Sequence, residues 1–133
     1  MNEIIPIDNS NITAIINAQK LGLDIGKPFS RQIYLISARI AGSFYVDDIE
    51  DLVDKIDTGS KLKFVREPDN KYDKLAIHVK DPDGNKLGYV PRDDNPILAR
   101  LMDAGKMIYG TIKEIDNSGD SYIDIRMEIY MDD

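Results

Sequence analysis

The spacing of apolar residues changes several times along the 133-residue chain, and each change marks a predicted element. Apolar residues at helical spacing predict helices over residues 9–21, 47–56 and 95–105. Runs of β-branched and aromatic residues, or alternating apolar and polar positions, predict strands over residues 32–40, 62–64, 75–79, 86–90, 107–115 and 121–130. The pattern therefore predicts a mainly β fold, α+β by content, with two or three helices.

Turn and cap signals between these segments indicate how they connect. Residues 82–85, Pro-Asp-Gly-Asn, are typical of a tight turn whose glycine adopts positive φ. Asn95 and Pro96 favour a helix start, Gly105 favours a helix end, and residues 116–120 favour a hairpin loop. Because residues 64–90 contain no helical segment, an open α/β sheet is disfavoured. We predict a small antiparallel OB-like β-barrel with inserted helices.

The composition excludes several classes of protein. Cysteine is absent, so the chain has no disulfide framework and no thiolate chemistry. A single histidine, His78, excludes a His-rich zinc site. No apolar run approaches the ~20 residues that span a bilayer, and the N-terminus lacks the pattern of a secretion signal. We expect one cytoplasmic domain over residues 1–133, without cofactor, metal or membrane contact.

The charge of the chain is acidic but unevenly distributed. Net charge is −7, the wrong sign for a general nucleic-acid coat. Residues 1–60 carry 5 basic and 9 acidic side chains, residues 61–100 carry 9 and 7, and residues 101–133 carry 3 and 8. The balances are −4, +2 and −5, so only the middle block is basic. That block fits a local anion-binding surface or an ordinary solvated surface.

Templates for catalysis are missing from the sequence. There is no Gly-rich phosphate loop, no serine in a nucleophile elbow and no histidine paired with a nucleophile. His78 alternates with the apolar residues Ile77 and Val79, so we expect a solvent-exposed strand histidine and not a ligand or a base. The acidic residues fall mainly in the 47–57 helix and the C-terminal strands, where solvated faces explain them. We therefore interpret the chain as a binding protein and not an enzyme.

One stretch carries a long and specific motif. Residues 66–79 read Arg-Glu-Pro-Asp-Asn-Lys-Tyr-Asp-Lys-Leu-Ala-Ile-His-Val, and residues 83–91 read Asp-Gly-Asn-Lys-Leu-Gly-Tyr-Val-Pro. In this loop, Tyr72 and Asp73 sit at the start of a strand, where a ring could stack a base and a carboxylate could accept a hydroxyl. The alternative is that Asp73 caps the loop and Tyr72 packs as a lid.

Residues 62–105, centred on this motif, resemble the HIRAN domain, with the expected order of flanking strands. HIRAN domains of fork-remodelling translocases have a fold similar to an OB barrel and capture the 3′-hydroxyl end of single-stranded DNA. In those domains aromatic residues hold the terminal bases, an acidic residue receives the hydroxyl, and basic residues meet the phosphates. The resemblance implies a barrel over residues 31–130, preceded by a helical extension over residues 1–30.

The resemblance also implies a set of site residues. Tyr72 and Asp73 match the tyrosine–aspartate pair of the loop. In the short segment 42–45, Tyr45 keeps an aromatic ring, but Phe44 replaces an expected arginine and so removes a phosphate contact. The resemblance also places Tyr89 on the aromatic position after Gly88 and Arg92 on a basic position just beyond it. Lys71 and Lys74 are added as candidates because, with Arg92, they would form a basic rim.

Two functions of different class follow from these residues. The first is a module that binds a single-stranded DNA end, in DNA repair or in the processing of replication forks. The second is a protein-interaction module, or a homodimer, whose acidic surfaces bind a basic partner and whose motif serves only the fold. A third interpretation, a hydrolase that uses Asp73 with a metal, has less support. A basic rim around Tyr45 and Tyr72 would favour the first, and a Tyr72 buried beneath the N-terminal helix would favour the second.

Overall fold

A computed structural model describes residues 31–117 and 123–132 of the chain. Within those residues it contains six strands, two α-helices and one 3-10 helix. The strands are β1 Gln32–Arg39, β2 Lys61–Arg66, β3 Ile77–Lys80, β4 Lys86–Tyr89, β5 Met107–Asp116 and β6 Asp124–Asp132. The helices are η1 Ser43–Tyr45, α2 Ile49–Val53 and α3 Asn95–Asp103. The prediction of a mainly β fold is confirmed.

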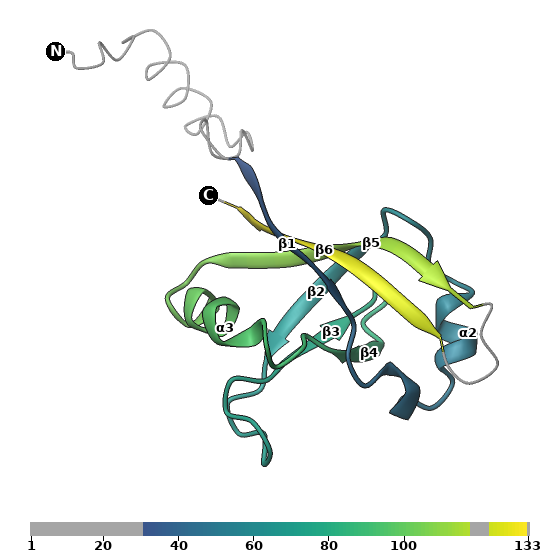
Figure 1. The fold of residues 1–133 in the computed structure, drawn as a ribbon, viewed down its shortest axis with the longest axis horizontal. Coiled ribbons are helices and arrows are strands. Elements are labelled where there is room, and N and C mark those ends of the chain that lie inside the picture. The colour runs from purple at the N-terminus through teal and green to yellow at the C-terminus, as the bar shows by residue number, and fades with distance from the viewer. Residues whose placement is uncertain (1–30, 118–122, 133) are drawn as a thin grey trace, which may run out of the picture. The chain divides into compact units, whose positions relative to one another are not determined.

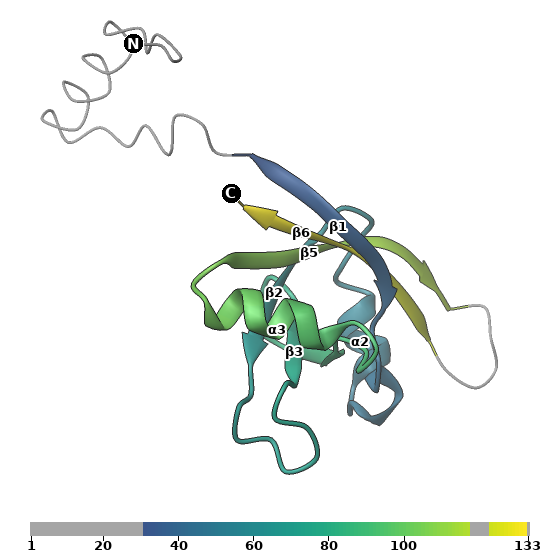
Figure 2. The same ribbon diagram turned by 60° about the vertical axis from the view of Figure 1, so that its left-hand side comes forward.

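All six strands belong to one antiparallel sheet with the order β1-β6-β5-β2-β3-β4 (Figures 1 and 2). Its longest pairing, β5 with β6, runs from Met107 opposite Asp132 to Asp116 opposite Asp124. Beyond the ladder, Ala41 and Tyr89 form an isolated bridge in which each residue donates a 2.8 Å backbone hydrogen bond to the other. This bridge links the end of β1 to β4 at a single point. The ladder is not closed, so a closed barrel stays a prediction.

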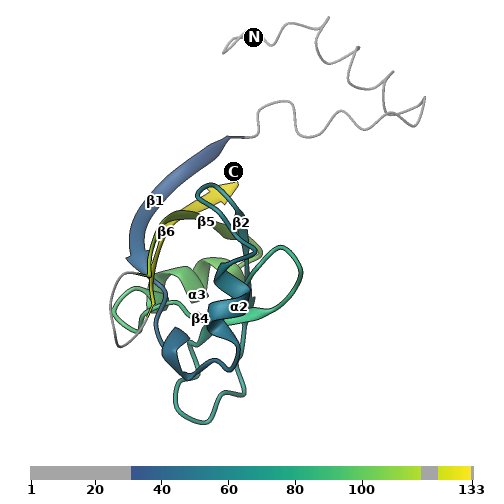
Figure 3. The same ribbon diagram turned by 90° about the vertical axis from the view of Figure 1, so that its right-hand side faces the viewer.

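The apolar core lies on the inner face of the curled sheet (Figure 3). Alternate residues of every strand point into it, and several of them are fully buried, among them Leu62, Ile77, Leu87, Ile112 and Ile125. Helix α3 adds Leu98 and Ala99 to the same cluster. Burying this apolar surface is the main force that holds the sheet in its curled form.

The ends of α3 explain why the helix stops where it does. Pro96 lies in the first turn, where a proline costs no hydrogen bond. At the other end, Gly105 adopts φ +94°, and its N–H donates to the carbonyl of Met102, while Lys106 donates to Leu101. These two bonds form a Schellman motif, which requires a residue of positive φ. The predicted helix end at Gly105 is confirmed.

Several predicted boundaries are wrong. The helix predicted over 47–56 is the shorter α2, which follows Asp48 in a left-handed conformation. The strand predicted from Leu75 begins instead at Ile77, because Leu75 and Ala76 close the preceding loop. The predicted helix over 9–21 lies outside the described residues, as does most of the predicted hairpin loop. Among the residues described, no helix is long and apolar enough to cross a membrane.

Candidate nucleic-acid interface

A cavity of about 530 Å³ opens where four segments meet: the residues after β1, the loop between β2 and β3, the end of β4, and the start of α3. Its polar and aromatic lining comprises Tyr45, Tyr72, Tyr89, Asn70, Asp73, Arg92 and Asn95. Small residues, among them Ala41, Gly42 and Ala76, line the rest. A cavity of this size, with aromatic walls and a few polar groups, is typical of a ligand site.

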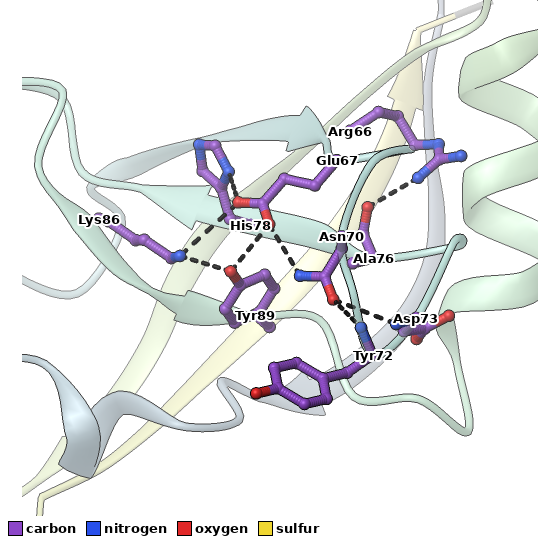
Figure 4. A network of polar contacts seen from close by, with 9 residues as sticks. All are labelled: Arg66, Glu67, Asn70, Tyr72, Asp73, Ala76, His78, Lys86 and Tyr89. Carbon is purple, nitrogen blue, oxygen red and sulfur yellow. Dashed lines mark hydrogen bonds and ion pairs between the residues drawn. The ribbon is translucent and has the colours of Figure 1, made fainter.

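Asn70 shapes the loop between β2 and β3 from within (Figure 4). Its side-chain oxygen accepts hydrogen bonds from the backbone N–H groups of Tyr72 (2.8 Å) and Asp73 (3.1 Å). Its side-chain nitrogen donates to Glu67 at 3.0 Å. An asparagine that bonds the backbone two and three residues ahead fixes a turn. The hydrogen bonds to Asn70 therefore fix the backbone that carries the side chains of Tyr72 and Asp73.

Arg66 anchors the other side of the loop. Its guanidinium donates to the carbonyl oxygens of Ala76 (2.7 Å) and Lys74 (3.0 Å), and it forms a two-pronged ion pair with Asp103 of α3 at 2.9 and 3.2 Å. The arginine side chain is only 14% exposed and its bond to Ala76 is partly buried, whereas Asp103 is 54% exposed and that ion pair faces solvent. Arg66 thereby fastens both the loop and the helix that carry the lining of the cavity. The bond to Arg66 also holds the pKa of Asp103 below its usual value.

Asp73 is the acidic group of the cavity, and its carboxylate is partly occupied. One oxygen accepts the backbone N–H of Leu75 at 2.9 Å, and the other accepts the side-chain amide of Asn95 at 2.8 Å. The guanidinium of Arg92 lies 3.8 Å from the second oxygen. The bond from Asn95, then the bond from Leu75, and the nearby arginines hold the pKa of Asp73 below its usual value. The group is therefore a carboxylate at neutral pH, with lone pairs left to accept a further donor.

The aromatic walls of the cavity are open to solvent. Tyr72 is 84% exposed and Tyr45 is 80% exposed, although both are large apolar side chains. Phe44, 62% exposed, lies against Tyr45 with ring centroids 4.3 Å apart. Exposed rings gathered at one place mark a binding surface more often than scattered single ones. The alternative of a Tyr72 buried beneath an N-terminal helix involves residues 1–30, which lie outside the described residues.

Behind Tyr89, a polar network joins the cavity wall to the loop (Figure 4). The Tyr89 hydroxyl donates to Glu67 at 2.9 Å, and Lys86 lies 2.5 Å from that hydroxyl and 3.6 Å from the carboxylate. Partial burial alone raises the pKa of Glu67, but hydrogen bonds from Asn70, Tyr89 and His78, with the charge of Lys86, lower it to about 2. Glu67 therefore stays ionised and links a loop residue to a wall residue.

His78 corrects one sequence prediction. It points to the outer face of β3, as the alternation predicted, but its side chain is only 14% exposed and it is not a freely solvated histidine. Its Nδ1 lies 2.5 Å from Glu67, and its ring meets that of Tyr89 edge-on at 6.4 Å. Cover from Tyr89 and Glu67, which sequence alternation alone cannot foresee, explains the low exposure.

Five of the eight residues singled out in the sequence line the cavity, namely Tyr45, Tyr72, Asp73, Tyr89 and Arg92. The other three do not. Phe44 lines a neighbouring hollow, while Lys71 and Lys74 lie exposed on the loop, so the basic rim consists of Arg92 alone among them. Sequence reasoning did not place Asn70, Asn95, Glu67 or Lys86 among the site residues. The Pro-x-Asn spacing was a usable signal for Asn70, whereas the roles of the others depend on contacts across the fold.

The chain belongs to the HIRAN family, because the family model for the HIRAN domain matches residues 33–132. That match covers the described sheet except its first residue, Gln32, together with the cavity, and it confirms the family resemblance drawn from the loop motif. A comparison with curated proteins found no match. Among the described residues, no group of three or more acidic or histidine side chains could hold a metal ion.

Solved structures agree with this assignment. The chain is similar to a crystal structure of a protein from Lactobacillus plantarum, with 29% identity and TM-score 0.72, over 78% of this chain and 98% of the other. It is also similar to the crystal structure of the HIRAN domain of human HLTF, with 19% identity and TM-score 0.59, over 76% and 78%. The HLTF HIRAN domain in its DNA-bound conformation aligns with 20% identity and TM-score 0.52, over 74% and 78%. At these identities, the HLTF likeness shows a shared fold.

Proposed function

We propose that this protein is a non-enzymatic module that binds the 3′ end of single-stranded DNA. The observation that carries the proposal is the meeting of Tyr45, Tyr72 and Tyr89 with Asp73 and Arg92 around one open cavity. DNA binding is a property of the HLTF HIRAN domain, whose DNA-bound structure shares this fold. The OB-like barrel of the family is proposed for this chain on the same likeness.

The chemistry of the cavity suits a terminal nucleoside better than an internal one. Exposed rings such as Tyr72 and Tyr45 can stack bases, each stack contributing ~1–3 kcal/mol. Asp73 is ionised and accepts hydrogen bonds, so a free 3′-hydroxyl would be a favourable donor to it. A 3′-phosphate in the same place would bring negative charges together. The guanidinium of Arg92, 69% exposed beside Asp73, would bind the last internucleotide phosphate.

The same arrangement gives no support to the hydrolase interpretation. Asp73 is engaged by Asn95, Leu75 and Arg92, and a cation such as Arg92 at 3.8 Å competes with any metal for the carboxylate. A hydrolytic metal site needs several oxygen or nitrogen ligands around one point. Binding without chemistry is the simpler use of these side chains, and capture of free 3′ ends would serve DNA repair or restart of stalled forks.

The test is a fluorescence-anisotropy titration of a 5′-labelled ten-nucleotide thymidine strand ending in a 3′-hydroxyl or a 3′-phosphate. We expect tighter binding of the hydroxyl end, and loss of that preference in Asp73→Asn. Tyr72→Ala is expected to weaken binding of the hydroxyl strand by about tenfold or more, from one lost stack. Ile97→Ala, a change at a 72% exposed side chain outside the cavity lining, is the matched control.

Two outcomes would contradict the proposal. Equal affinity for both ends in the wild-type protein would remove the role of Asp73. Absence of binding at low salt, where phosphate contacts are strongest, would favour the alternative of a protein partner or homodimer. In that case pull-down with basic peptides and measurement of the oligomeric state would be the next experiments.

A further inference from the structure

The outer face of the sheet carries one continuous cross-strand row of tyrosines and lysines. The strand registers place Tyr34 opposite Tyr130, Tyr130 opposite Tyr109, Tyr109 opposite Lys63, Lys63 opposite Lys80, and Lys80 opposite Lys86. The row therefore crosses all six strands, with tyrosines on β1, β6 and β5 and lysines on β2, β3 and β4. Lys61, two residues before Lys63 on the same face, extends the lysine part and lies 4.6 Å from the ring of Tyr109.

The tyrosine half of the row is packed and flanked by acids. The rings of Tyr109 and Tyr130 stack with centroids 5.7 Å apart, and Tyr109 is only 7% exposed, so its face is not open to a base. Glu128 and Asp132 stand two residues to either side of Tyr130 on the same outer face. A negatively charged strand would be repelled there. Only the part of the row beyond Tyr109, on β2, β3 and β4, is therefore suited to bind an anion.

The lysine half has the opposite character. Among the described residues, Lys61, Lys63 and Lys80 have no ion pair, whereas Arg39, Arg66, Arg92 and Arg126 all have carboxylate partners. The nearby Asp81 is 2% exposed, and its carboxylate accepts hydrogen bonds from the backbone N–H groups of Asp83 and Asn85 within the turn. Asp83 is the remaining exposed acid of that turn. The cations are left to face solvent.

The register makes this arrangement unfavourable for folding alone. Lys63 and Lys80 are direct cross-strand partners, with a second lysine, Lys86, opposite Lys80 on its other side. Like charges directly opposite on neighbouring strands destabilise a sheet. The charge of Lys86 is partly compensated by Glu67 and by the ring of Tyr89, but among the described residues Lys63 and Lys80 have no carboxylate partner. A row of this kind is stabilised when a polyanion lies across it.

The lysine row also leads to the cavity. Lys86 contacts Tyr89, and Tyr89 lines the cavity, so the last lysine and the aromatic wall are adjacent. From β4 to β2 the lysines cross two inter-strand intervals, about 10 Å at the usual spacing of ~4.8 Å. At the stacked rise of ~3.4 Å per nucleotide, this length accommodates about three nucleotides.

We propose that Lys86, Lys80, Lys63 and Lys61 form a phosphate track that carries a DNA single strand away from the cavity, across the outer face of β4, β3 and β2. The inference rests on the proposed function, because the strand is the one whose 3′ end occupies the cavity. The track ends at Tyr109, where Glu128 and Asp132 begin to repel phosphates. The protein thus binds the 3′ end in the cavity and a few adjacent nucleotides of the same DNA strand along the lysines.

The experiment compares two labelled thymidine strands with 3′-hydroxyl ends, a trinucleotide that fills only the cavity and a ten-nucleotide strand that also reaches the track. The test variant is Lys63→Gln with Lys80→Gln in the 133-residue chain. The matched control is Lys55→Gln with Lys106→Gln, which removes the same charge from exposed positions outside the strands. Each titration is repeated at several salt concentrations.

Loss of two phosphate contacts should weaken binding of the long strand on the order of tenfold at 50 mM salt, and reduce the salt slope by about 1.4. The trinucleotide affinity and the long-strand affinity of the control should stay within about twofold of wild type. The thermal midpoint of the test variant should rise slightly because the opposed lysines are gone. A merely structural role for these lysines would instead lower that midpoint and weaken the trinucleotide equally.

The failures of the two proposals are distinguishable. If the long strand binds the test variant and the control equally, the track is refuted while the cavity stands. If the ends are not distinguished but the long strand still depends on Lys63 and Lys80, the end capture is refuted and only the binding of a strand to the lysine row stands. If the wild-type protein binds neither strand, both are refuted. An acidic protein fragment that displaces the long strand and shows the same lysine dependence would also overturn the assignment of this surface to DNA.

Discussion

Two of the segments that bring aromatic rings to the cavity are held in different ways. The loop between β2 and β3 carries Tyr72 and is fixed by side chains, chiefly Asn70 from within and Arg66 from the adjoining strand. The segment after β1 carries Tyr45 and is fixed by backbone, through the bridge of Ala41 to Tyr89 and the left-handed Gly42 at φ +73°. The first segment depends on particular polar side chains, and the second depends on the close approach of main chains.

This difference explains why the two segments have such unequal signatures in the sequence. Side-chain hydrogen bonds require particular residue types at particular spacings, so the loop reads as a long motif. Backbone contacts require only side chains small enough for two main chains to approach each other. The segment 41–45 therefore shows few residue requirements in the sequence apart from Gly42. The expected arginine at position 44 could be replaced by Phe44 without any loss of local structure, because that side chain is 62% exposed.

Gly88→Ala should be the most damaging change to the backbone-held segment. Gly88 has φ +152°, and an added Cβ would lie 2.4 Å from the carbonyl oxygen of Ala41 and 2.7 Å from the side chain of Ile40. The backbones of β4 and of residues 40–41 would have to separate at the bridge, so we expect a loss of about 3 kcal/mol or more in the free energy of unfolding. Urea denaturation measures this loss. Gly59→Ala, with φ +89° and nothing within 4 Å, is the control and should cost only about 1 kcal/mol.

Glu67→Gln should remove an electrostatic support that joins the loop to Tyr89, the residue whose backbone forms the bridge to Ala41. Since the pKa of Glu67 in the folded protein is about 2 against an ordinary value of 4.5, its ionised form stabilises the fold above about pH 4.5. That stabilisation, about 2 kcal/mol after allowance for a side chain that is 24% exposed, is lost as the pH falls from about 4.5 toward 2. Urea midpoints of both proteins at pH 7, 4 and 3 should therefore converge at the acid end. A constant difference across this range would contradict the role of the charge.

Asn70→Ala should loosen the side-chain-held loop alone. Two backbone N–H groups and one carboxylate oxygen lose their partner, so we expect about 1–2 kcal/mol of destabilisation. Hydrogen exchange should accelerate at residues 70–76 and stay unchanged at residues 41–46. Equal acceleration in both segments would mean that the loop and the backbone bridge form one cooperative unit.

Tyr72→Ala and Tyr45→Ala should hardly alter stability, because the two side chains are 84% and 80% exposed. Each is expected to change the free energy of unfolding by less than about 0.5 kcal/mol. The same substitutions should weaken binding of the thymidine strand by about 1–3 kcal/mol. A large loss of stability without a change in binding would reassign these rings to packing, the alternative that the sequence left open for Tyr72.

Much of the fold was predictable from local chemistry. Alternation and β-branching predicted the six strands, and Gly84 and Gly105 predicted the turn and the helix end, because such signals act over a few residues. The strand order was not predictable, since pairing of β2 with β5 joins residues distant in the sequence. The start of β3 was misjudged for a related reason: Arg66 captures the carbonyl of Ala76, so the loop persists where apolar residues suggested a strand.

Contiguous residue types were enough to define the family, the loop with its Tyr72–Asp73 pair, and the basic middle block. Which of the predicted residues share a cavity depended on the three-dimensional arrangement. Folding brought Asn95 and Arg92 to Asp73, left Lys71 and Lys74 outside, and joined Lys63, Lys80 and Lys86 in one row. The physical reason is register: a strand places alternate residues on opposite faces, and a shift of one residue in pairing would have sent every lysine of that row to the core side.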